Sequence, residues 1–530
     1  MLGQQPVIII RENVDRTQGY EAQRSNINAA KAIAEAVRST LGPRGMDKML
    51  VNNSGDIVVT NDGITILDEI AVQHPGARMV IEVSRTQDEE VGDGTTTAVV
   101  LVGAMMEQAE IMLNKKIHPS VITRGYRMGM TKALEIIEDM SIAIKADDRA
   151  TLIKIADTAM TGKSIESVKD KVKEIAVDAV MTVATHEKKI TVSEDDVQIK
   201  KQTGSSMDDI KLIRGVIIEK NRVNNEMPKK VQGAKVALIA SPLEIKKTEV
   251  KSKIKISTID QMSAFSEQER ASLKKFSDAV IASGANVLLC QKGIADAVQF
   301  FLAKGNILAI EDVPEKDMKF AARALGATIV NKADDLTPEM LGSAELVEEL
   351  DDADEVMLSG CSNPKTVTIS IRGSSLYLVD ELERAVIDAT RVVMDVMEDG
   401  KVIVGGGAPE TELIIRLREY AISVGGREQM AIEAYADSFA SIPLTLAENS
   451  GFNPIDMLVA MKLAHAEGKR NAGLDVFKGA VKDMLEAGVV EPLRIKRQAI
   501  MSSEEAVHML IRVDDMMVSQ SSHRSPAPGL

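Results

Sequence analysis

Residues 90–101 of the chain, EVGDGTTTAVVL, place two glycines around Asp93 and three threonines, Thr95, Thr96 and Thr97, before an apolar run. A glycine-rich turn that opens a helix is typical of a phosphate site, because the backbone N–H groups and dipole of a helix N-terminus attract anions. A carboxylate is acceptable there if Mg²⁺ lies between it and the phosphates. The stretch therefore predicts an Mg²⁺-phosphate site, with the alternative that Asp93 only caps the helix and the glycines only form the turn.

Two other phosphate motifs fail on their spacing. Gly162-Lys163-Ser164 ends like a P-loop, but the motif requires a glycine at position 157, which is Asp157. The GDG stretch starts like a dinucleotide fingerprint, but Thr97 stands at its third glycine position and no clear strand precedes it. Neither a Walker A loop nor a nicotinamide site is expected.

Length and composition indicate a multidomain, helix-rich protein. A chain of 530 residues exceeds the size of a single core and should form roughly three domains. Aromatic residues make up only 2% and Trp is absent, so the cores must consist of aliphatic residues and the 28 Met. Such a composition favours packed helices.

Charge and cysteine content exclude several classes of function. A formal charge of −15 disfavours binding to nucleic acid or to an anionic membrane. Two cysteines, Cys290 and Cys361, and six scattered histidines provide neither a disulfide framework nor a zinc site. The N-terminus has no signal-peptide pattern, so we expect a cytoplasmic protein.

Periodicity divides the chain into helical ends and an α/β middle. A helix is predicted over 26–37, ended by LGPRG at 41–45, and a hairpin over 49–63 with turns at 54–56 and 61–63. Helices then continue to about Ile144, including a buried helix over 95–113 that is apolar on nearly every side. Apolar residues at helical spacing occur again after Asp380, and a last strand is predicted at 508–513.

The middle of the chain predicts a parallel β-α-β-α-β unit, with strands at 285–290, 307–310 and 328–330. Residues 244–276 are charged at first and then offer apolar residues at helical spacing, among them Phe265. This segment is either a projecting arm or a solvated loop followed by a surface helix. Because helical segments at both ends flank this α/β region, we expect the central region to be an insertion into a domain formed by the two termini.

Seven motifs, taken together in order and spacing, resemble the archaeal thermosome subunits, which are group II chaperonins. The motifs are LGPRGMDKML (41–50), VVTNDGITIL (58–67), EVGDGTTTAVVL (90–101), AMTGKS (159–164), LERAVIDATR (382–391), VGGGAPE (404–410) and VVEPLRIK (489–496). The resemblance covers essentially the whole chain. It implies an α+β multidomain chaperonin fold and an ATP-dependent chaperone.

The resemblance also implies roles for individual residues. Asp388 would orient and deprotonate the attacking water, with Asp62 as a second carboxylate near the γ-phosphate, and Asp93 would bind Mg²⁺. Lys163 would sense the γ-phosphate. The remaining nucleotide contacts would be Gly42 and Pro43 along the nucleotide, Gly94, Thr95, Thr96 and Thr97 at the phosphates, and Gly407 and Glu491 near adenine and ribose. Phosphoryl transfer needs this separation of a metal-binding carboxylate from a water-binding one.

Three domains follow from the resemblance. An equatorial ATPase domain would comprise 1–145 and 404–530, an intermediate hinge domain 146–213 and 366–403, and an apical client-binding domain 214–365. Residues 244–276 would be the helical protrusion that serves as a built-in lid, with Phe265 as a candidate contact for clients or for the closed lid.

The implied partners are non-native polypeptides and sister subunits in two stacked rings of eight or nine. Terminal strands near Val7–Ile10 and Met509–Val513 would pair with a neighbour's hairpin, which would remove exposed strand edges. The sequence departs from the family at Arg44, where lysine is common, and in its tail, SSHRSPAPGL.

Two other functions are compatible with parts of the sequence. A ring scaffold or holdase subunit would bind clients with little ATPase activity of its own. A subunit without ATPase activity could have lost Asp62, Asp93 or Asp388. All three are present in this chain, which favours an active ATPase over a scaffold. A small-molecule kinase would need a defined acceptor pocket, of which the sequence gives no sign. An active ATPase is the favoured prediction.

Overall fold

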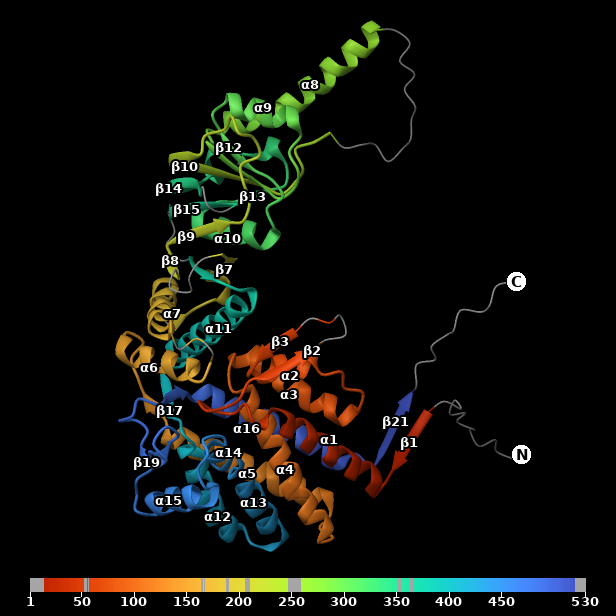
Figure 1. Ribbon diagram of the computed structural model, residues 1–530. Coiled ribbons are helices and arrows are strands. Elements are labelled where there is room, and N and C mark those ends of the chain that lie inside the picture. Colours follow the sequence, from red (N-terminus) through yellow and green to blue (C-terminus); the bar gives the residue numbers. More distant parts are fainter. Residues whose placement is uncertain are drawn as a thin grey trace, which may run out of the picture. The chain divides into compact units, whose positions relative to one another are not determined.

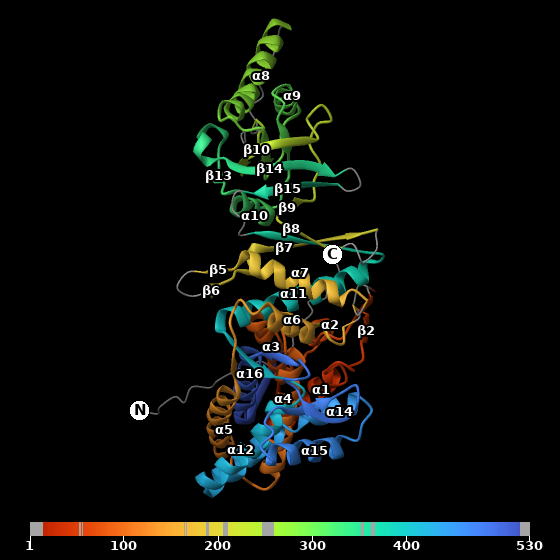
Figure 2. The ribbon, with the colours of Figure 1, turned by 90° about the vertical axis from the view of Figure 1, so that its left-hand side faces the viewer.

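The computed structural model describes residues 14–51, 55, 57–163, 165, 167–186, 190–204, 210–245, 259–350, 354–361 and 366–519. The chain forms two compact units (Figures 1 and 2). The terminal unit combines residues 1–166 with 387–530, and the middle unit comprises residues 167–386. The predicted insertion of a central region between two ends that fold together is therefore confirmed, and the finer division into three domains stays a prediction.

The terminal unit is mainly helical. Its helices are α1 (Tyr20–Arg38), α2 (Gly63–Glu69), α3 (Pro75–Val91), α4 (Thr95–Asn114), α5 (Pro119–Met140), α6 (Arg149–Met160), α12 (Ala408–Val424), α13 (Gly426–Ser438), α14 (Ser441–Asn449), α15 (Pro454–Ala466) and α16 (Leu493–Arg512). The long helix α11 (Leu376–Asp399) belongs to this unit from Ile387 onward.

Short antiparallel sheets connect these helices. β1 (Val14–Gln18) pairs with β21 (Asp515–Ser519), and β2 (Lys48–Val51) pairs with β3 (Ile57–Thr60) as the predicted hairpin. A three-stranded sheet has the order β20 (Val490–Pro492), β17 (Lys401–Val404), β4 (Ile142–Ala143). β18 (Ala472–Asp475) pairs with β19 (Ala480–Asp483).

Helix α4 lies at the centre of the core of the terminal unit. It packs against α1, α3, α13 and α16 (Figure 1), and its residues from Ala98 to Val102 are almost completely buried. By length and composition it is the one helix among the described residues that could span a membrane, but 56% of its apolar window is buried inside the protein. The predicted buried helix over 95–113 is thus confirmed, and the N-terminus of α4 starts inside the protein.

The middle unit contains a mixed seven-stranded sheet, ordered β12 (Leu308–Ile310), β11 (Val287–Cys290), β10 (Lys230–Ile239), β14 (Gly342–Leu350), β15 (Glu355–Cys361), β9 (Gly215–Ile218), with β13 (Ile329–Val330) also on β10. A second sheet has the order β7 (Val197–Thr203), β16 (Val367–Gly373), β8 (Lys211–Ile213), and β5 (Thr185–His186) pairs with β6 (Ile190–Thr191). Its helices are α7 (Lys169–Val183), α8 (Ile259–Ala282), α9 (Asp296–Lys304) and α10 (Glu315–Leu325), with short 3₁₀ turns at Glu194–Asp196, Ala333–Asp335 and Pro338–Met340.

The predicted β-α-β-α-β unit corresponds to β11-α9-β12-α10-β13. β10, β11 and β12 are parallel to one another, and β13 is parallel to β10. The remaining strands of this sheet, β14, β15 and β9, pair antiparallel. The parallel unit is confirmed as one half of a mixed sheet.

Helix α8 extends from this sheet (Figures 1 and 2). Residues 267–272 are all exposed, whereas Leu273 and Val280 are buried in the core of the unit. The start of the predicted arm, 246–258, and the side chain of Phe265 lie outside the described residues. The exposed turns favour a projecting arm over an ordinary surface helix.

Two local predictions were wrong. Residues 508–512 are the last turns of α16, because Val507, Leu510 and Ile511 lie on its buried face, and the strand begins only at Asp515. Residues 61–63 are not a hairpin turn but the start of α2, with Asp62 as its N-cap. The expected strand at Val7–Ile10 lies outside the described residues.

Candidate functional site

The GDG loop connects α3 to α4 through two left-handed glycines. Gly92 (φ 66°) ends α3 and Gly94 (φ 81°) precedes α4, a conformation that glycine adopts without the steric cost of a Cβ. Between them, Asp93 Oδ1 accepts the N–H of Gly94 at 2.6 Å. The loop thereby presents one carboxylate beside the first turn of α4, where Thr95, Thr96 and Thr97 have backbone N–H groups without partners within the helix.

Asp62 lies at the N-terminus of α2 and is held there by Thr65. Its Oδ2 accepts the N–H of Thr65 at 3.1 Å and the hydroxyl of Thr65 at 2.6 Å. A methyl group on Gly63 would lie 2.6 Å from Thr96 Oγ1, so the start of α2 is packed directly on the start of α4. Asp62 is therefore fixed next to the GDG loop.

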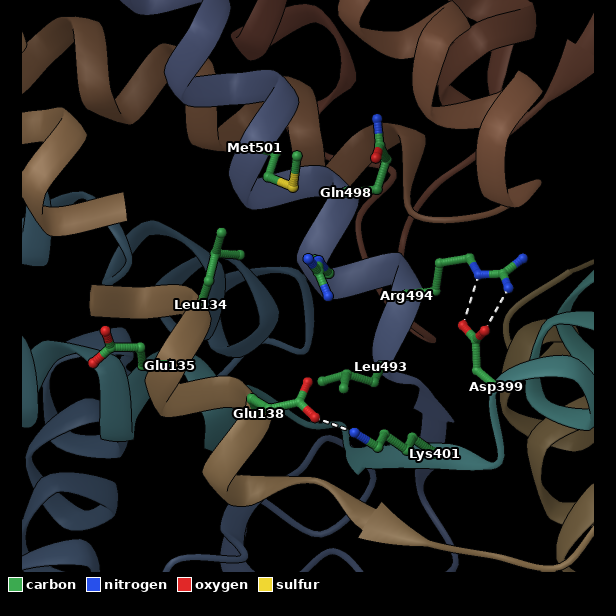
Figure 3. Close-up of a pocket in the computed structure, with 10 residues that line it drawn as sticks. Leu134, Glu135, Glu138, Asp399, Lys401, Leu493, Arg494, Gln498 and Met501 are labelled. Carbon is green, nitrogen blue, oxygen red and sulfur yellow. Dashed lines mark hydrogen bonds and ion pairs between the residues drawn. The ribbon is translucent and has the colours of Figure 1, made fainter. Parts of the chain in front are cut away.

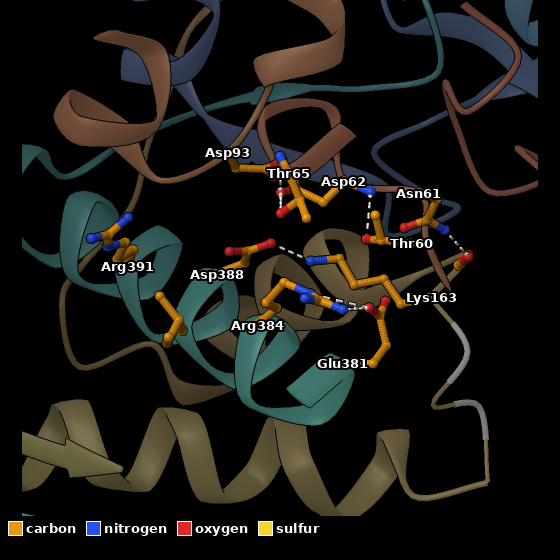
Figure 4. Close-up of polar contacts among 12 residues, drawn as sticks. Thr60, Asn61, Asp62, Thr65, Asp93, Lys163, Glu381, Arg384, Asp388 and Arg391 are labelled. Atoms are coloured by element: carbon orange, nitrogen blue, oxygen red, sulfur yellow. Dashed lines mark hydrogen bonds and ion pairs between the residues drawn. The ribbon is translucent and has the colours of Figure 1, made fainter. Parts of the chain in front are cut away.

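Lys163 and Asp388 form an ion pair between the loop after α6 and helix α11 (Figure 4). The side chain of Lys163 is 14% exposed and that of Asp388 is 18% exposed. Burial alone would lower the pKa of Lys163, but the charges of Asp388, Asp93 and Asp62 outweigh it and raise this pKa. Three carboxylates thus share one lysine.

The surplus of negative charge affects the acids in turn. Burial raises the pKa of Asp388 to about 7, with Lys163 opposing the shift and Asp93 and Asp62 adding to it. Burial also raises the pKa of Asp93, again against the attraction of Lys163. A carboxyl group whose pKa lies near neutrality suits a general base, and an additional cation would relieve the repulsion among the acids.

The glycine loops at residues 42 and 162 pack backbone against backbone. A methyl group on Gly162 (φ 92°) would lie 2.7 Å from Cα of Pro43, and Asn61 Nδ2 donates to the carbonyl of Gly162 at 2.9 Å. Gly42 (φ 84°) lies against the side chain of Leu446. These contacts bring Gly42 and Pro43 next to the loop of Lys163.

Glu491 and the glycine loop 405–407 form the other side of the site. Glu491 lies on β20 opposite Ile403 of β17, and Gly405 follows β17, so that a methyl group on Gly405 would lie 3.3 Å from Glu491 Oε1. Gly407 (φ 76°) is the N-cap of α12. Burial raises the pKa of Glu491 to about 7.

The structure brings the predicted site residues together from distant segments. Asp62, Asp93, Lys163 and Asp388 interact electrostatically as one cluster, and Pro43 contacts the Lys163 loop through Gly162. Glu491 interacts electrostatically with Asp93. Gly407 belongs to the loop 405–407, whose Gly405 lies against Glu491. Thr97 lies on the first turn of α4.

Comparisons with known proteins agree with this arrangement. The family model of the TCP-1/cpn60 chaperonin family matches residues 33–521. The chain belongs to this family. It is 51% identical over 517 residues to a thermosome subunit of Methanopyrus kandleri, covering 97% of this chain and 95% of that protein. It is 50% identical over 528 residues to the thermosome subunit beta of Archaeoglobus fulgidus, and the match covers 99% of this chain and 97% of that protein.

A solved structure is similar as well. The open-state monomer of a group II chaperonin from Methanococcoides burtonii matches with a TM-score of 0.62 and 42% identity, covering 80% of this chain and all of that one. The sequence-based prediction of an α+β chaperonin fold is confirmed. This chaperonin subunit is an ATP-dependent chaperone with ATPase activity, as the family and its thermosome relatives indicate.

Several residues of the chaperonin site were not predicted. Gln87, which is completely buried on α3, donates through Nε2 to the carbonyls of Asp93 and Ile495. Arg391 of α11 donates to the carbonyl of Asp88 and packs over Gly92, where a methyl group would lie 2.3 Å from its Cδ. The third such residue is Lys496 of α16. Of the three, it alone could have been noticed in the sequence, because it is a charged residue on the buried, apolar face of its helix.

The arrangement fits one magnesium ion bound mainly by substrate. Among the described residues, no three His, Cys, Asp or Glu side chains converge as a complete metal site. Mg²⁺ in nucleotide sites keeps several waters and takes only one or two carboxylates. Asp93, half-buried beside two other carboxylates, has the charge and position for such a ligand.

The terminal unit also contains a hollow of about 700 Å³ away from these residues (Figure 3). It lies between the end of α5, the start of β17 and the first turns of α16, and Arg494 there binds Asp399 while Lys401 pairs with Glu138. None of the predicted site residues lines it. Its walls combine apolar side chains, such as Leu134, Leu493 and Met501, with the charged side chains of these two ion pairs.

Proposed function

We propose that this chaperonin subunit hydrolyses Mg-ATP at the cluster of Asp62, Asp93, Lys163 and Asp388 and uses the reaction to drive a folding chamber. The observation that carries the proposal is the convergence of these four side chains, from segments far apart in the chain, on the N-terminus of α4. The cluster contains separate carboxylates for a metal and for a water, as phosphoryl transfer to water requires.

The roles follow from the local geometry. The first turn of α4 would bind the phosphates through its N–H groups, and Asp93 would hold Mg²⁺, which would neutralise charge on the phosphate oxygens. Asp388 accepts the proton of the attacking water, and Asp62 assists at the γ-phosphate. Lys163, which pairs with Asp388, is positioned to exchange this partner for the γ-phosphate. Gly42, Pro43, Gly407 and Glu491 enclose the nucleoside.

For the remainder of the chain we propose the three-domain division given by the family resemblance. Residues 1–145 and 404–530 form the ATPase domain, 146–213 and 366–403 the hinge, and 214–365 the client-binding domain. The exposed turns of α8 support its role as part of a lid that encloses non-native polypeptide. Both cysteines are free thiols, which supports a cytoplasmic location.

The proposed assembly is a double ring of eight or nine subunits, with sister subunits or copies of the same chain. Met49, Val51, Ile57 and Val59 on the β2–β3 hairpin are 40–71% exposed. An exposed apolar hairpin with open edges favours pairing with another strand. The two-stranded sheet β1–β21 of a neighbour is the proposed partner.

The test is to purify the chain alone and to measure particle mass together with Mg-dependent ATP hydrolysis, for the wild type and for Asp388→Ala. Hydrolysis by a particle of ring size that Asp388→Ala abolishes is the expected result. A ring without ATP hydrolysis would overturn the proposal in favour of the scaffold or holdase. A chain that assembles and hydrolyses ATP only when a sister subunit is added would place it in a mixed ring.

A further inference from the structure

Lys496 is a buried cation that no role above includes. Its side chain is 10% exposed, and its Nζ lies 2.6 Å from Glu410 Oε1 and 3.2 Å from Glu491 Oε1. It also interacts electrostatically with Asp93. Burying a lysine is costly unless it is paired, and this one is paired with carboxylates of two different segments.

The first turn of α16 carries Lys496 to the metal side of the site. Its neighbour Ile495 packs on the GDG loop, where a methyl group on Gly94 would lie 2.8 Å from Ile495 Cγ2. The amide of Gln87 donates both to the carbonyl of Ile495 at 3.2 Å and to that of Asp93 at 2.9 Å. The backbone at Lys496 is thereby fixed relative to Asp93.

The other side of Lys496 faces the nucleoside end of the site. Glu491 lies on β20 against Gly405, and Glu410 lies in the first turn of α12, three residues after Gly407. Both carboxylates are largely buried, with side chains 19% and 3% exposed. Oε2 of Glu410 has no hydrogen-bond partner among the described residues.

Without a cation, this pair of acids would favour protonation. Burial raises the pKa of Glu491, the neighbouring Glu410 raises it further, and Lys496 is the first of the groups that lower it. In the other direction, burial disfavours the charged lysine, but Glu410 and Glu491 together raise the pKa of Lys496. A charged acceptor makes a stronger hydrogen bond to a hydroxyl than a neutral one.

We propose that Lys496 is a positioning residue that favours the ionised form of Glu491 and orients this carboxylate as the acceptor for a ribose hydroxyl of the nucleotide. The inference rests on the proposed function, because it assigns Glu491 to the nucleoside end of that site. Lys496 acts through Glu491 and does not touch the reacting phosphate, so it should govern nucleotide affinity and selectivity for ribose rather than the rate of the chemical step.

A purely structural function of Lys496 would be to join α16 to α12 through Glu410. The two functions predict opposite effects of Glu410→Gln. If Lys496 acts by orienting Glu491, removing the charge of Glu410 leaves Glu491 as the only charged partner of the lysine in this pair of acids, and the affinity for ATP stays the same or increases. If the Lys496–Glu410 contact matters as a structural link, Glu410→Gln weakens the site as Lys496→Met does.

The experiment uses assembled full-length protein and measures kcat, KM and the Kd for ATP, 2′-deoxy-ATP and 3′-deoxy-ATP by calorimetry. For Lys496→Met we expect ATP to bind about tenfold more weakly while kcat at saturation changes less than about threefold. The loss should be smaller for the deoxy analogue that lacks the accepted hydroxyl. Lys496→Arg should retain affinity, and Lys496→Met/Glu410→Gln should recover part of it, because one of the two uncompensated carboxylates is gone.

The inference is overturned if Lys496→Met binds ATP like the wild type, if the loss is equal for ATP and both deoxy analogues, or if Glu410→Gln weakens binding as much. If Lys496→Met does not assemble, Glu410→Gln and Lys496→Arg decide the question. The proposal is contradicted if either of these two substitutions weakens ATP binding about tenfold. A failure of the proposed function is distinguishable, because then the wild type itself would not hydrolyse ATP.

Discussion

Lys163 and Asp388 form a partly buried ion pair although 225 residues separate them in the sequence. Asp388 lies on α11 and Lys163 on the loop after α6, and the other acids near this lysine are Asp62 and Asp93. The pair has two consequences for catalysis. It favours the ionised form of the carboxylate that we propose as the proton acceptor, and it makes this form dependent on the position of the Lys163 ammonium group.

Replacing Asp388 by asparagine should separate binding from hydrolysis. The amide retains the shape of the side chain but cannot accept a proton, so kcat should fall by roughly 10²–10⁴-fold while the Kd for ATP changes only severalfold. Steady-state hydrolysis and calorimetric titration of the same preparation measure the two quantities. Asp399→Asn, on the last turn of the same helix, is the matched control, and undiminished turnover in Asp388→Asn would exclude it as the base.

Replacing Lys163 by methionine should move the pH profile of kcat/KM. The base must be deprotonated, so in the wild type activity should fall as the pH drops through about 7, the pKa of Asp388 in the free protein. Lys163 lowers this pKa, so its removal should raise the pKa and shift the acid limb to higher pH. A profile of Lys163→Met with reduced activity but an unmoved acid limb would mean that the lysine acts on the phosphate alone.

Much of the site could be predicted because its glycines and acids occur in short motifs whose order is specific. The motif TNDG at 60–63 shows the limit of such patterns. Asp is favoured both in tight turns and at helix N-caps, and only the packing of Gly63 against Thr96 decides for the helix. The strand predicted at 508–513 was wrong for a related reason, since a β-branched, apolar segment can equally be the buried face of a long helix.

Other parts of the site could not be predicted because their partners are far apart in the sequence. Gln87 joins Asp93 to Ile495, which is 408 residues away, and no local pattern distinguishes it from a surface glutamine on an amphipathic helix. Lys496 is a cation on an apolar helix face, which is a weak indication in the sequence, but its pairing with Glu410 depends on the tertiary structure that brings the first turn of α12 to the first turn of α16. Such long-range pairs are set by tertiary structure.

Replacing Asp93 by asparagine should weaken Mg-ATP binding rather than the proton transfer. The amide is a poorer ligand for Mg²⁺ than a carboxylate, so the Mg²⁺ concentration for half-maximal hydrolysis should rise about tenfold or more, with recovery of activity at high Mg²⁺. A titration of Mg²⁺ at saturating ATP measures it. Glu90→Gln removes an exposed charge from the end of α3 and should behave like the wild type. An unchanged Mg²⁺ requirement in Asp93→Asn would assign the metal elsewhere.

Replacing Gly162 by alanine should displace the Lys163 loop. The backbone at Gly162 has φ 92°, and the added methyl group would lie 2.7 Å from Cα of Pro43, whose backbone cannot move aside as a flexible side chain would. We expect kcat/KM to fall about tenfold or more. Gly468→Ala is the control, because it introduces alanine at a similar φ of 87° with no atom within 4 Å. Equal effects of both substitutions would mean that backbone strain, and not the contact with Pro43, is responsible.

Glu504 provides a prediction about stability in the core of the terminal unit. Its side chain is completely buried, 3.3 Å from Arg127, and neither carboxylate oxygen has a hydrogen-bond partner among the described residues. Burial raises the pKa of Glu504 to about 7, with Arg127 lowering it and Glu505 raising it.

The sign of the effect follows from the proton balance. Between the ordinary pKa of glutamic acid, about 4.3, and about 7, the folded protein holds a proton that the unfolded chain has released, so the stability contributed by Glu504 decreases as the pH rises. Glu504→Gln removes this dependence. The melting temperature of Glu504→Gln relative to the wild type should therefore rise by a few degrees between pH 5 and pH 8, which corresponds to on the order of 2 kcal/mol.

Thermal melting of the full chain at several pH values measures the difference, and the comparison at each pH cancels the titration of groups that do not interact with Glu504. Among the groups that do interact with it is His508, whose Nδ1 lies 3.6 Å from Glu504 Oε1. Glu505→Gln, an exposed neighbour that also faces Arg127, should show a much smaller trend, because it removes only the part of the Glu504 pKa shift that Glu505 contributes. A difference between Glu504→Gln and the wild type that does not change with pH would show that Glu504 is ionised throughout, with Arg127 compensating fully for its burial.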